Sequence, residues 1–224
     1  MPDIERLTWA IQEELGVEKV HVPFAVMVKL ARVLRENEFR ICVKGRWEND
    51  SFCCMDICPP EDTALVGCAM DIGTTTLVCS LLEGSGRELA VAACPNPQAA
   101  YGADVVTRIR EALEGRMEEL TRLVRSALEE LGLRCCREAG IQPQQVNIVS
   151  PVGNTCMRQL FLGLSPENLG KLPYSRAVTE PKRMPCASFF PAFSEAELVV
   201  LPDIGPFVGT DTLGCILSSR IYEK

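Results

Sequence analysis

The sequence predicts an α/β protein in two parts, a small α+β domain with its linker at residues 1–62 and a larger α/β domain at residues 63–224. Three observations predict this organisation. Near the N-terminus, apolar residues recur first at helical and then at strand spacing. Further along, three strand-like segments are joined by short turns. After them, helical and strand-like segments alternate, which is typical of a mixed sheet with helices covering its faces.

In the smaller part, apolar residues recur at helical spacing over residues 4–15, and Gly16 is placed to end that helix. Pro23 can open a second helix, whose apolar stripe runs over residues 26–34. Residues 39–44 alternate apolar and polar side chains, as a half-buried strand does, and a second strand is expected near residues 52–57. Two prolines at 59 and 60, followed by two acids, predict a linker.

In the larger part, we expect a five-stranded mixed sheet. The first three strands are predicted at residues 66–72, 75–82 and 88–93, and a long helix covers residues 113–131. A fourth strand is predicted at residues 146–152 and a fifth at residues 198–201. Helices are expected after Thr155 and from near Gly209.

The overall composition is that of a globular protein, with 47% hydrophobic and 24% charged residues. The net charge of -7 argues against nucleic acid as a partner, because neutralising phosphates requires a surplus of Lys and Arg. The sequence contains no run of eighteen apolar residues and starts with acids in place of an apolar signal segment. We therefore expect a cytoplasmic protein with no membrane segment.

The chain has twelve cysteines and one histidine, and it lacks a Cys-x-x-Cys pair. We interpret the cysteines as reduced thiols in the core and on the surface, where a thiol behaves as a small hydrophobe. The cluster of Cys53, Cys54 and Cys58 leaves a metal site open as the alternative.

The turn Asp-Ile-Gly-Thr-Thr-Thr joins the first two strands of the larger part. Gly73 has no Cβ to block an approaching ligand, and Thr74, Thr75 and Thr76 supply backbone amides and hydroxyls, which favour anions. Asp71 ends an apolar strand, and Mg²⁺ is usually held by one or two carboxylates and water. We predict a phosphate-binding turn; the alternative is a solvated hairpin turn with Asp71 as a local acceptor. The sequence has no P-loop motif.

The predicted strand order is that of half of the actin-like (ribonuclease H-like) ATPase fold, shared by acetate and sugar kinases, heat-shock chaperones and actin. Three stretches narrow the resemblance: NPQAAYGADVVTRI at 96–109, PVGNTCMRQLFLGLSPENLGKLPY at 151–174 and LPDIGPFVGTDTLGCIL at 201–217. They closely resemble the reductive activators of corrinoid proteins. The resemblance covers nearly the whole chain, and residues 1–60 look like that family's middle domain.

The resemblance implies an ATP-dependent activator that returns the Co(II) corrinoid of a methyltransferase system to Co(I). Its partner would be a corrinoid protein or corrinoid iron–sulfur protein. The family's activators are often dimeric, which leaves a homodimer open for this chain.

The resemblance also implies roles for individual residues. Asp71, Gly73 and Thr74–Thr76 would form the first phosphate loop with Mg²⁺. Residues 209–216 look like the helix that crosses between the two halves of the ATPase. At the start of that helix, Gly209, Asp211 and Thr212 would face the nucleotide or cap the helix. Gly153, Asn154 and Thr155 precede another helix, and they would contact phosphate or cap it.

Asp104 would act as an acid near the γ-phosphate or lie at the surface that meets the corrinoid protein. The alternative is a helix-initiating Asp104 followed by a solvated Arg108.

Two pieces of the family pattern are missing from this sequence. The spacing for a [2Fe–2S] cluster does not occur, so we expect that cluster only in a missing N-terminal domain. The second phosphate loop would begin where the sequence ends, so we expect a fragment or a truncated product with weak or no ATPase activity alone. Two other functions stay open: a small-molecule kinase of the same fold, with Asp104 as its carboxylate, and a non-catalytic module that binds a corrinoid protein.

Overall fold

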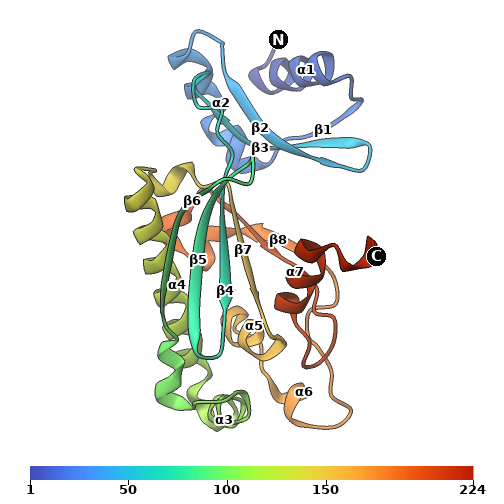
Figure 1. Ribbon diagram of the computed structural model, residues 1–224. Helices are drawn as coiled ribbons and strands as arrows, with labels where there is room; N and C mark the ends of the chain where they lie inside the picture. The colour runs from blue at the N-terminus through green and yellow to red at the C-terminus, as the bar shows by residue number, and fades with distance from the viewer. Residues whose placement is uncertain (224) are drawn as a thin grey trace. The chain divides into compact units, whose positions relative to one another are not determined.

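The computed structural model describes residues 1–223, and its contacts divide the chain between Leu65 and Val66 into two compact units (Figure 1). The first unit contains two helices, α1 (Asp3–Leu15) and α2 (Phe24–Glu36). Its three strands are β1 (Lys19–His21), β2 (Cys42–Glu48) and β3 (Ser51–Cys58), in the order β1-β3-β2. β2 and β3 form an antiparallel hairpin, and β1 pairs with β3 in parallel.

The first unit has its own hydrophobic core, and its helices lie where the sequence predicts them. Gly16 ends α1 in the left-handed conformation, at φ 66°. Leu7 and Ile11 of α1 pack with Val26 and Leu30 of α2 in a core that also includes residues of β3. β1 is absent from the sequence prediction, because three residues with one apolar side chain carry no detectable alternation.

The second unit is built on a six-stranded mixed sheet in the order β6-β5-β4-β7-β9-β8. β4 (Val66–Ile72), β5 (Thr76–Glu83) and β6 (Glu88–Pro95) form an antiparallel meander. β7 (Ile148–Gly153) lies parallel to β4, and β9 (Glu197–Val200) lies parallel to β7. The mixed sheet with flanking helices confirms the predicted α/β fold class.

The strand number is corrected from five to six. The additional strand, β8 (Lys182–Pro185), pairs antiparallel with β9 at the edge of the sheet. Its four residues are Lys, Arg, Met and Pro, and charges and proline are typical of an edge strand because they discourage pairing with another chain. Because charged residues and proline are also typical of loops, the sequence does not predict this strand.

Helices follow the strands of the second unit. They are α3 (Val105–Glu111), α4 (Met117–Ala139), α5 (Thr155–Leu162), α6 (Glu167–Gly170) and α7 (Thr210–Ser219). A π turn, η2 (Ala112–Arg116), joins α3 to α4. The 3₁₀ turns are η1 (Pro97–Tyr101), η3 (Pro143–Gln145), η4 (Cys186–Ser188), η5 (Pro191–Phe193) and η6 (Ile221–Glu223).

The core of the second unit lies between the sheet and the helices that follow it. α4 packs along β5 and β6, as Figure 1 shows, and it also contacts α5. Leu120, Val124 and Leu128 of α4 are fully buried with Met70 and Leu77 of the sheet. Burial of each such side chain contributes about 1.5–3 kcal/mol, so this face of α4 fixes the helix to the sheet.

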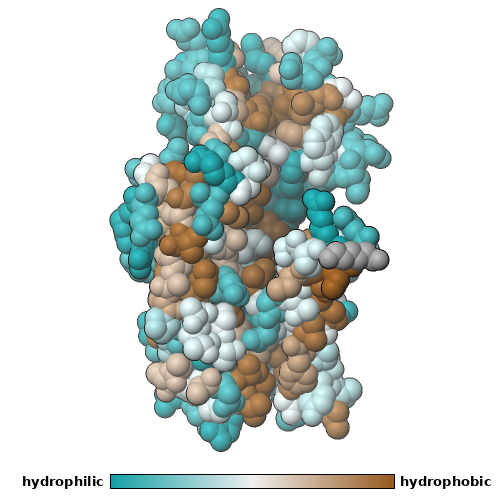
Figure 2. Space-filling model, viewed as in Figure 1, coloured by the Kyte–Doolittle hydropathy of each residue, from teal (hydrophilic) through white to brown (hydrophobic). Residues whose placement is uncertain are grey.

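α7 is less buried than α4, because Thr210, in its first turn, is its only buried residue. Leu217, Ile221 and Tyr222 are exposed, and Figure 2 shows hydrophobic side chains gathered around α7 and the C-terminal turn. Within residues 1–223, no helix is both long and apolar enough to cross a membrane.

The twelve cysteines are all free thiols. Nine are buried, among them Cys68 and Cys79 in the sheet core, whose sulfurs lie 3.1 Å apart, and Cys215 on α7 is exposed. Across the described part of the chain, no group of three or more His, Cys, Asp or Glu side chains is arranged to hold a metal ion.

Candidate functional site

The candidate site lies where the parallel strands β4 and β7 end. Asp71 of β4 is opposite Val152 of β7, and Ile72 is opposite Gly153. The turn at residues 73–76 follows β4, and β7 ends at Gly153, directly before Asn154 and Thr155. In open α/β sheets, ligands bind at the carboxyl ends of such strands.

The carbonyl groups of the turn are held by the protein beneath it. The Asn96 side chain donates from Nδ2 to the Gly73 carbonyl at 2.8 Å, and its backbone N–H donates to the Thr75 carbonyl at 2.8 Å. Arg108 donates from Nη2 to the Thr74 carbonyl at 2.6 Å. Three successive carbonyls of the turn are therefore directed to buried donors.

This orientation determines where the amides of the turn point. In a trans peptide the C=O and the following N–H lie on opposite sides, so the N–H groups of Thr74, Thr75 and Thr76 point away from the buried donors. For residues 1–223, no hydrogen bond from the N–H of Thr74 or Thr75 is recorded. Successive free amides on one side of a turn make a concavity that binds anions.

Gly73 has a local role in closing this turn. A Cβ at this position would lie 2.4 Å from the Thr76 carbonyl oxygen, which is backbone and cannot move aside without opening the turn. The sequence predicts that Gly73 leaves room for a ligand, and the structure shows that the turn itself needs the glycine.

Arg108 is fully buried, so the alternative of a solvated arginine is wrong. Besides Thr74, its guanidinium donates to the Gly102 carbonyl at 2.9 Å, the Gln98 Oε1 at 3.3 Å and the Met157 sulfur at 3.1 Å. All of these acceptors are neutral. Burial lowers the pKa of Arg108, but a guanidinium is not deprotonated in proteins, so Arg108 keeps its charge at neutral pH.

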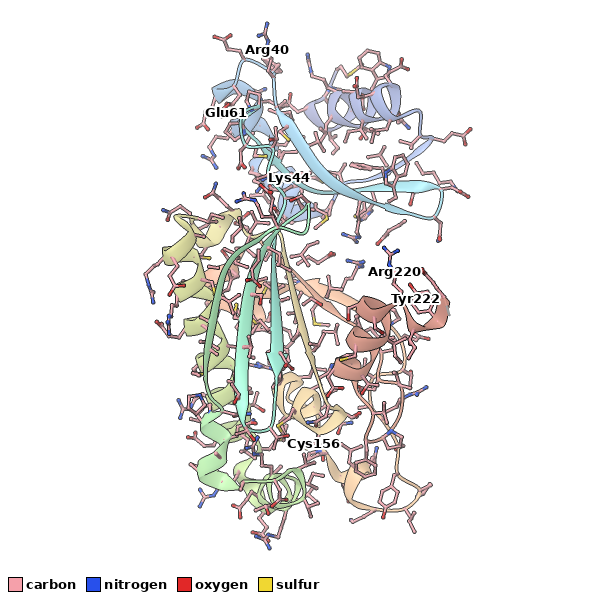
Figure 3. All side chains as sticks on the ribbon, in the orientation of Figure 1. Arg40, Lys44, Glu61, Cys156, Arg220 and Tyr222 are labelled. Carbon is pink, nitrogen blue, oxygen red and sulfur yellow. The ribbon has the colours of Figure 1, made fainter. Side chains whose placement is uncertain are left out.

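Cys156, labelled in Figure 3, lies on α5 near Arg108. Burial raises the pKa of this thiol to about 12, and the nearby guanidinium of Arg108 opposes that rise. Cys156 is therefore neutral at physiological pH and does not balance the charge of Arg108.

Asp71 and Asp211 bring two carboxylates to the site. The Asp71 side chain is exposed, but the surrounding protein partly desolvates it, which raises its pKa, and the Asp211 carboxylate at the start of α7 raises that pKa further. Asp211 in turn accepts a hydrogen bond from the Thr212 N–H at 2.7 Å. A divalent cation between the two carboxylates would relieve their repulsion, and Mg²⁺ needs only one or two carboxylates besides water and phosphate. The donor set therefore fits Mg²⁺.

The segment after β7 connects the turn to α7. Asn154 caps α5 by accepting from the Met157 N–H at 3.0 Å, and it donates to the Thr74 hydroxyl at 3.3 Å. The Gly153 N–H donates to the Thr210 hydroxyl at 3.2 Å. A Cβ on Gly209 would lie 2.2 Å from the Gly153 carbonyl oxygen, so the glycine lets α7 begin against β7.

Thr155 and Asp104 have structural partners. The buried Thr155 hydroxyl donates to the Gly205 carbonyl at 2.9 Å. Asp104 caps α3, because its two oxygens accept from the N–H and the hydroxyl of Thr107, each at 2.9 Å. These hydrogen bonds lower the pKa of Asp104, so the carboxyl is ionised at neutral pH and holds no proton to donate. Its catalytic role stays a prediction to which the geometry adds no support.

A buried ion pair beside the site is missing from the sequence prediction. Arg158 of α5 pairs with Asp203, and both side chains are about 1% exposed. Arg158 also donates to the Leu201 carbonyl. Among the described residues, Asp203 Oδ2 has no hydrogen-bond partner, and burial raises the pKa of this carboxyl despite Arg158. The charge of Asp211 raises it further, so the pair lies within electrostatic reach of the site.

The strand order and flanking helices are consistent with an actin-like ATPase-type fold. The sequence model of the family described as RACo middle region matches residues 66–224, and the chain belongs to this family. Residues 1–65 lie outside that match, and their assignment as a middle domain stays a prediction.

Two relatives extend this result. The chain is 31% identical over 163 residues to the corrinoid activation enzyme RamQ of Eubacterium limosum, a match that covers 70% of this chain and 27% of the relative. A solved structure described as a reductive activator for corrinoid,iron-sulfur protein matches with a TM-score of 0.88 and 26% identity. That match covers all of this chain and 36% of the other. The resemblance to reductive activators is confirmed, and the chain spans about a quarter to a third of the length of these relatives.

Proposed function

We propose that this chain supplies the first phosphate loop of a Mg·ATP site in a reductive activator of corrinoid proteins. One observation carries the proposal: the turn at residues 73–76 has its carbonyls tied to Asn96 and Arg108 and its amides directed outward. Such a turn binds phosphate oxygens without rearrangement, because its donors are already oriented.

In this proposal, each group at the site has a separate task. The amides of Thr74, Thr75 and Thr76 bind phosphate oxygens, and Asn154 orients the Thr74 hydroxyl. Asp71, with Asp211 opposite, holds Mg²⁺. When bound, this ion neutralises phosphate charge. Gly209 lets α7 approach closely enough to bring Asp211 to the turn.

We further propose that the partner is a corrinoid protein whose Co(II) cofactor is returned to Co(I) for a methyltransferase system. The similarity to the corrinoid activation enzyme RamQ and to the solved reductive activator for corrinoid,iron-sulfur protein supports this choice of partner. ATP can drive a change in the partner only by binding more tightly to one conformation of the activator than to another. Because α7 starts at the phosphate turn, it is the element that a change in Mg·ATP occupancy would displace first.

The test compares Asp71→Asn with Asp104→Asn in the complete gene product that contains these residues. ATP turnover is measured by the release of inorganic phosphate, and corrinoid reduction by the absorbance change from Co(II) to Co(I). Asp71→Asn should abolish ATP turnover and corrinoid reduction together, because it removes a magnesium ligand. Asn is as good a helix cap as Asp, so Asp104→Asn should keep both activities if Asp104 only caps α3.

Intact corrinoid reduction in Asp71→Asn would refute the assignment of Asp71. Loss of activity in Asp104→Asn, with α3 still folded, would restore Asp104 as a catalytic carboxylate.

A further inference from the structure

We propose that Arg108 is a positioning residue for phosphate binding: its buried, unbalanced charge both orients the turn and attracts the anion. This inference rests on the proposed function. It concerns a residue that does not reach the ligand itself, because the Thr74 peptide lies between the guanidinium and the outward face of the turn.

The first step is geometric. Arg108 Nη2 donates to the Thr74 carbonyl at 2.6 Å, and the same peptide unit carries the Thr75 N–H on its opposite side. Fixing the carbonyl therefore fixes the N–H. The rest of the guanidinium is held by Gly102, Gln98 and Met157, so the fork cannot rotate away from Thr74.

The second step concerns charge. Two arginines are almost completely buried in the second unit, and they differ in their partners. Arg158 pairs with the Asp203 carboxylate, whereas within residues 1–223 every hydrogen-bond acceptor of Arg108 is neutral. A buried charge normally has a partner, because leaving water without one costs several kcal/mol.

The groups near Arg108 do not supply that partner. Asp104 interacts with Arg108 electrostatically, but it accepts its hydrogen bonds from Thr107 and forms no ion pair with Arg108. Because Asp104 is exposed at the start of α3, solvent screens its charge. Cys156 is a neutral thiol. A phosphate chain on the outer side of the turn would complete the arrangement, since the guanidinium polarises the Thr74 peptide and strengthens the Thr75 N–H as a donor.

The test uses Arg108→Met, Arg108→Lys and a matched control, Arg125→Met, in the complete gene product. Arg125 is partly buried, and like Arg108 it donates to a backbone carbonyl (Phe161, at 2.8 Å) and has a pKa lowered by burial. Its recorded contacts are with Phe161 and Phe189, and none is with the turn. Removing Arg125 therefore costs stability of the same kind at a different place.

For each variant, the dissociation constant of Mg·ATP and the thermal midpoint with and without ATP are measured. Arg108→Met should weaken ATP binding at least about tenfold and remove most of the ATP-induced rise in midpoint. Arg108→Lys keeps the charge without the fork and should recover part of the affinity. Arg125→Met should lower the midpoint yet bind ATP within about twofold of the unaltered protein.

Three results would overturn the inference. The first is unchanged ATP affinity in Arg108→Met, and the second is an equal loss of affinity in Arg125→Met. The third is an Arg108→Lys variant that folds and binds ATP as tightly as the unaltered protein. This variant decides the question if Arg108→Met does not fold. Absence of ATP binding by the unaltered protein would overturn the proposed function together with this inference, so the two failures are distinguishable.

Discussion

Replacing Arg158 with methionine breaks the buried ion pair with Asp203 and leaves a carboxylate in the core. Both side chains are about 1% exposed, and Asp203 Oδ2 already has no partner among the described residues. Removing one member of such a pair costs about 3–5 kcal/mol. For a unit of this size, each kcal/mol lowers the thermal midpoint by roughly 2–4 °C, so we expect a decrease of roughly 6–20 °C.

The loss should depend on pH. Burial raises the pKa of Asp203 above its unfolded value, so the folded state binds this proton more tightly than the unfolded state does. Stability tied to Asp203 therefore increases as pH falls through the window between the two pKa values. Without Arg158 the pKa of Asp203 rises further, and the destabilisation of Arg158→Met should be smaller at pH 5 than at pH 8.

The assays are thermal denaturation, for the midpoint, and urea denaturation, for the free energy of unfolding, both followed by circular dichroism at 222 nm. Both tryptophans, Trp9 and Trp47, lie in the first unit, so their fluorescence provides an internal reference for that unit. The double variant Arg158→Met with Asp203→Leu should recover most of the lost stability, since an apolar pair often replaces a buried ion pair without cost. A loss below about 1 kcal/mol in the single variant, or a double variant no more stable than it, would refute this reasoning.

Three other predictions concern the turn and its carboxylate. Gly73→Ala should destabilise the second unit by about 1–3 kcal/mol and weaken ATP binding, because its Cβ would lie 2.4 Å from a backbone oxygen. A Cβ on Gly67, in the preceding strand β4, meets nothing closer than 4.0 Å, so Gly67→Ala should be nearly neutral in a urea titration. Equal effects of the two substitutions would contradict the steric argument. Asp71→Asn should remove Mg·ATP binding and yet raise the ligand-free stability at neutral pH by at most about 1 kcal/mol, because it relieves repulsion by Asp211 at an exposed position. For the unaltered protein, the affinity for Mg²⁺ should fall as pH decreases through the raised pKa of Asp71, as protons compete for the carboxylate; a pH-independent affinity would exclude Asp71 as the ligand.

Local sequence patterns predicted much of the fold. β4 begins and ends at the predicted residues, because alternating apolar side chains mark its buried face and Gly73 marks the turn that follows it. α4 is displaced from its prediction: residues 112–116 form a π turn, and the buried Cys135 and Cys136 extend the helix to Ala139. Short polar strands such as β8 are set by pairing with a neighbour, which no local pattern records.

In the candidate site, too, the sequence predicts features made by adjacent residues and misses those that depend on distant ones. The turn at residues 73–76 is visible in the sequence because its residues are adjacent. Its supports are distant along the chain: Asn96 lies 23 residues from Gly73, and Arg108 lies 34 residues from Thr74. The ion pair beside the site is as widely separated, with Asp203 45 residues from Arg158. Each looks like a loop or surface residue in isolation. Only the folded structure shows that the charged side chain of Arg108 is buried beneath the turn at residues 73–76.

The distribution of thiols also provides a practical probe of the site. The thiolate is the reactive form of cysteine, and burial raises the pKa of most thiols in this chain, those of Cys135 and Cys156 to about 12. Within residues 1–223, Cys215 is the one exposed cysteine, and it lies on α7, whose first turn carries Asp211. A maleimide dye added briefly at neutral pH should therefore attach first at Cys215. Its fluorescence would then report movement of α7 when nucleotide is added, without an introduced cysteine.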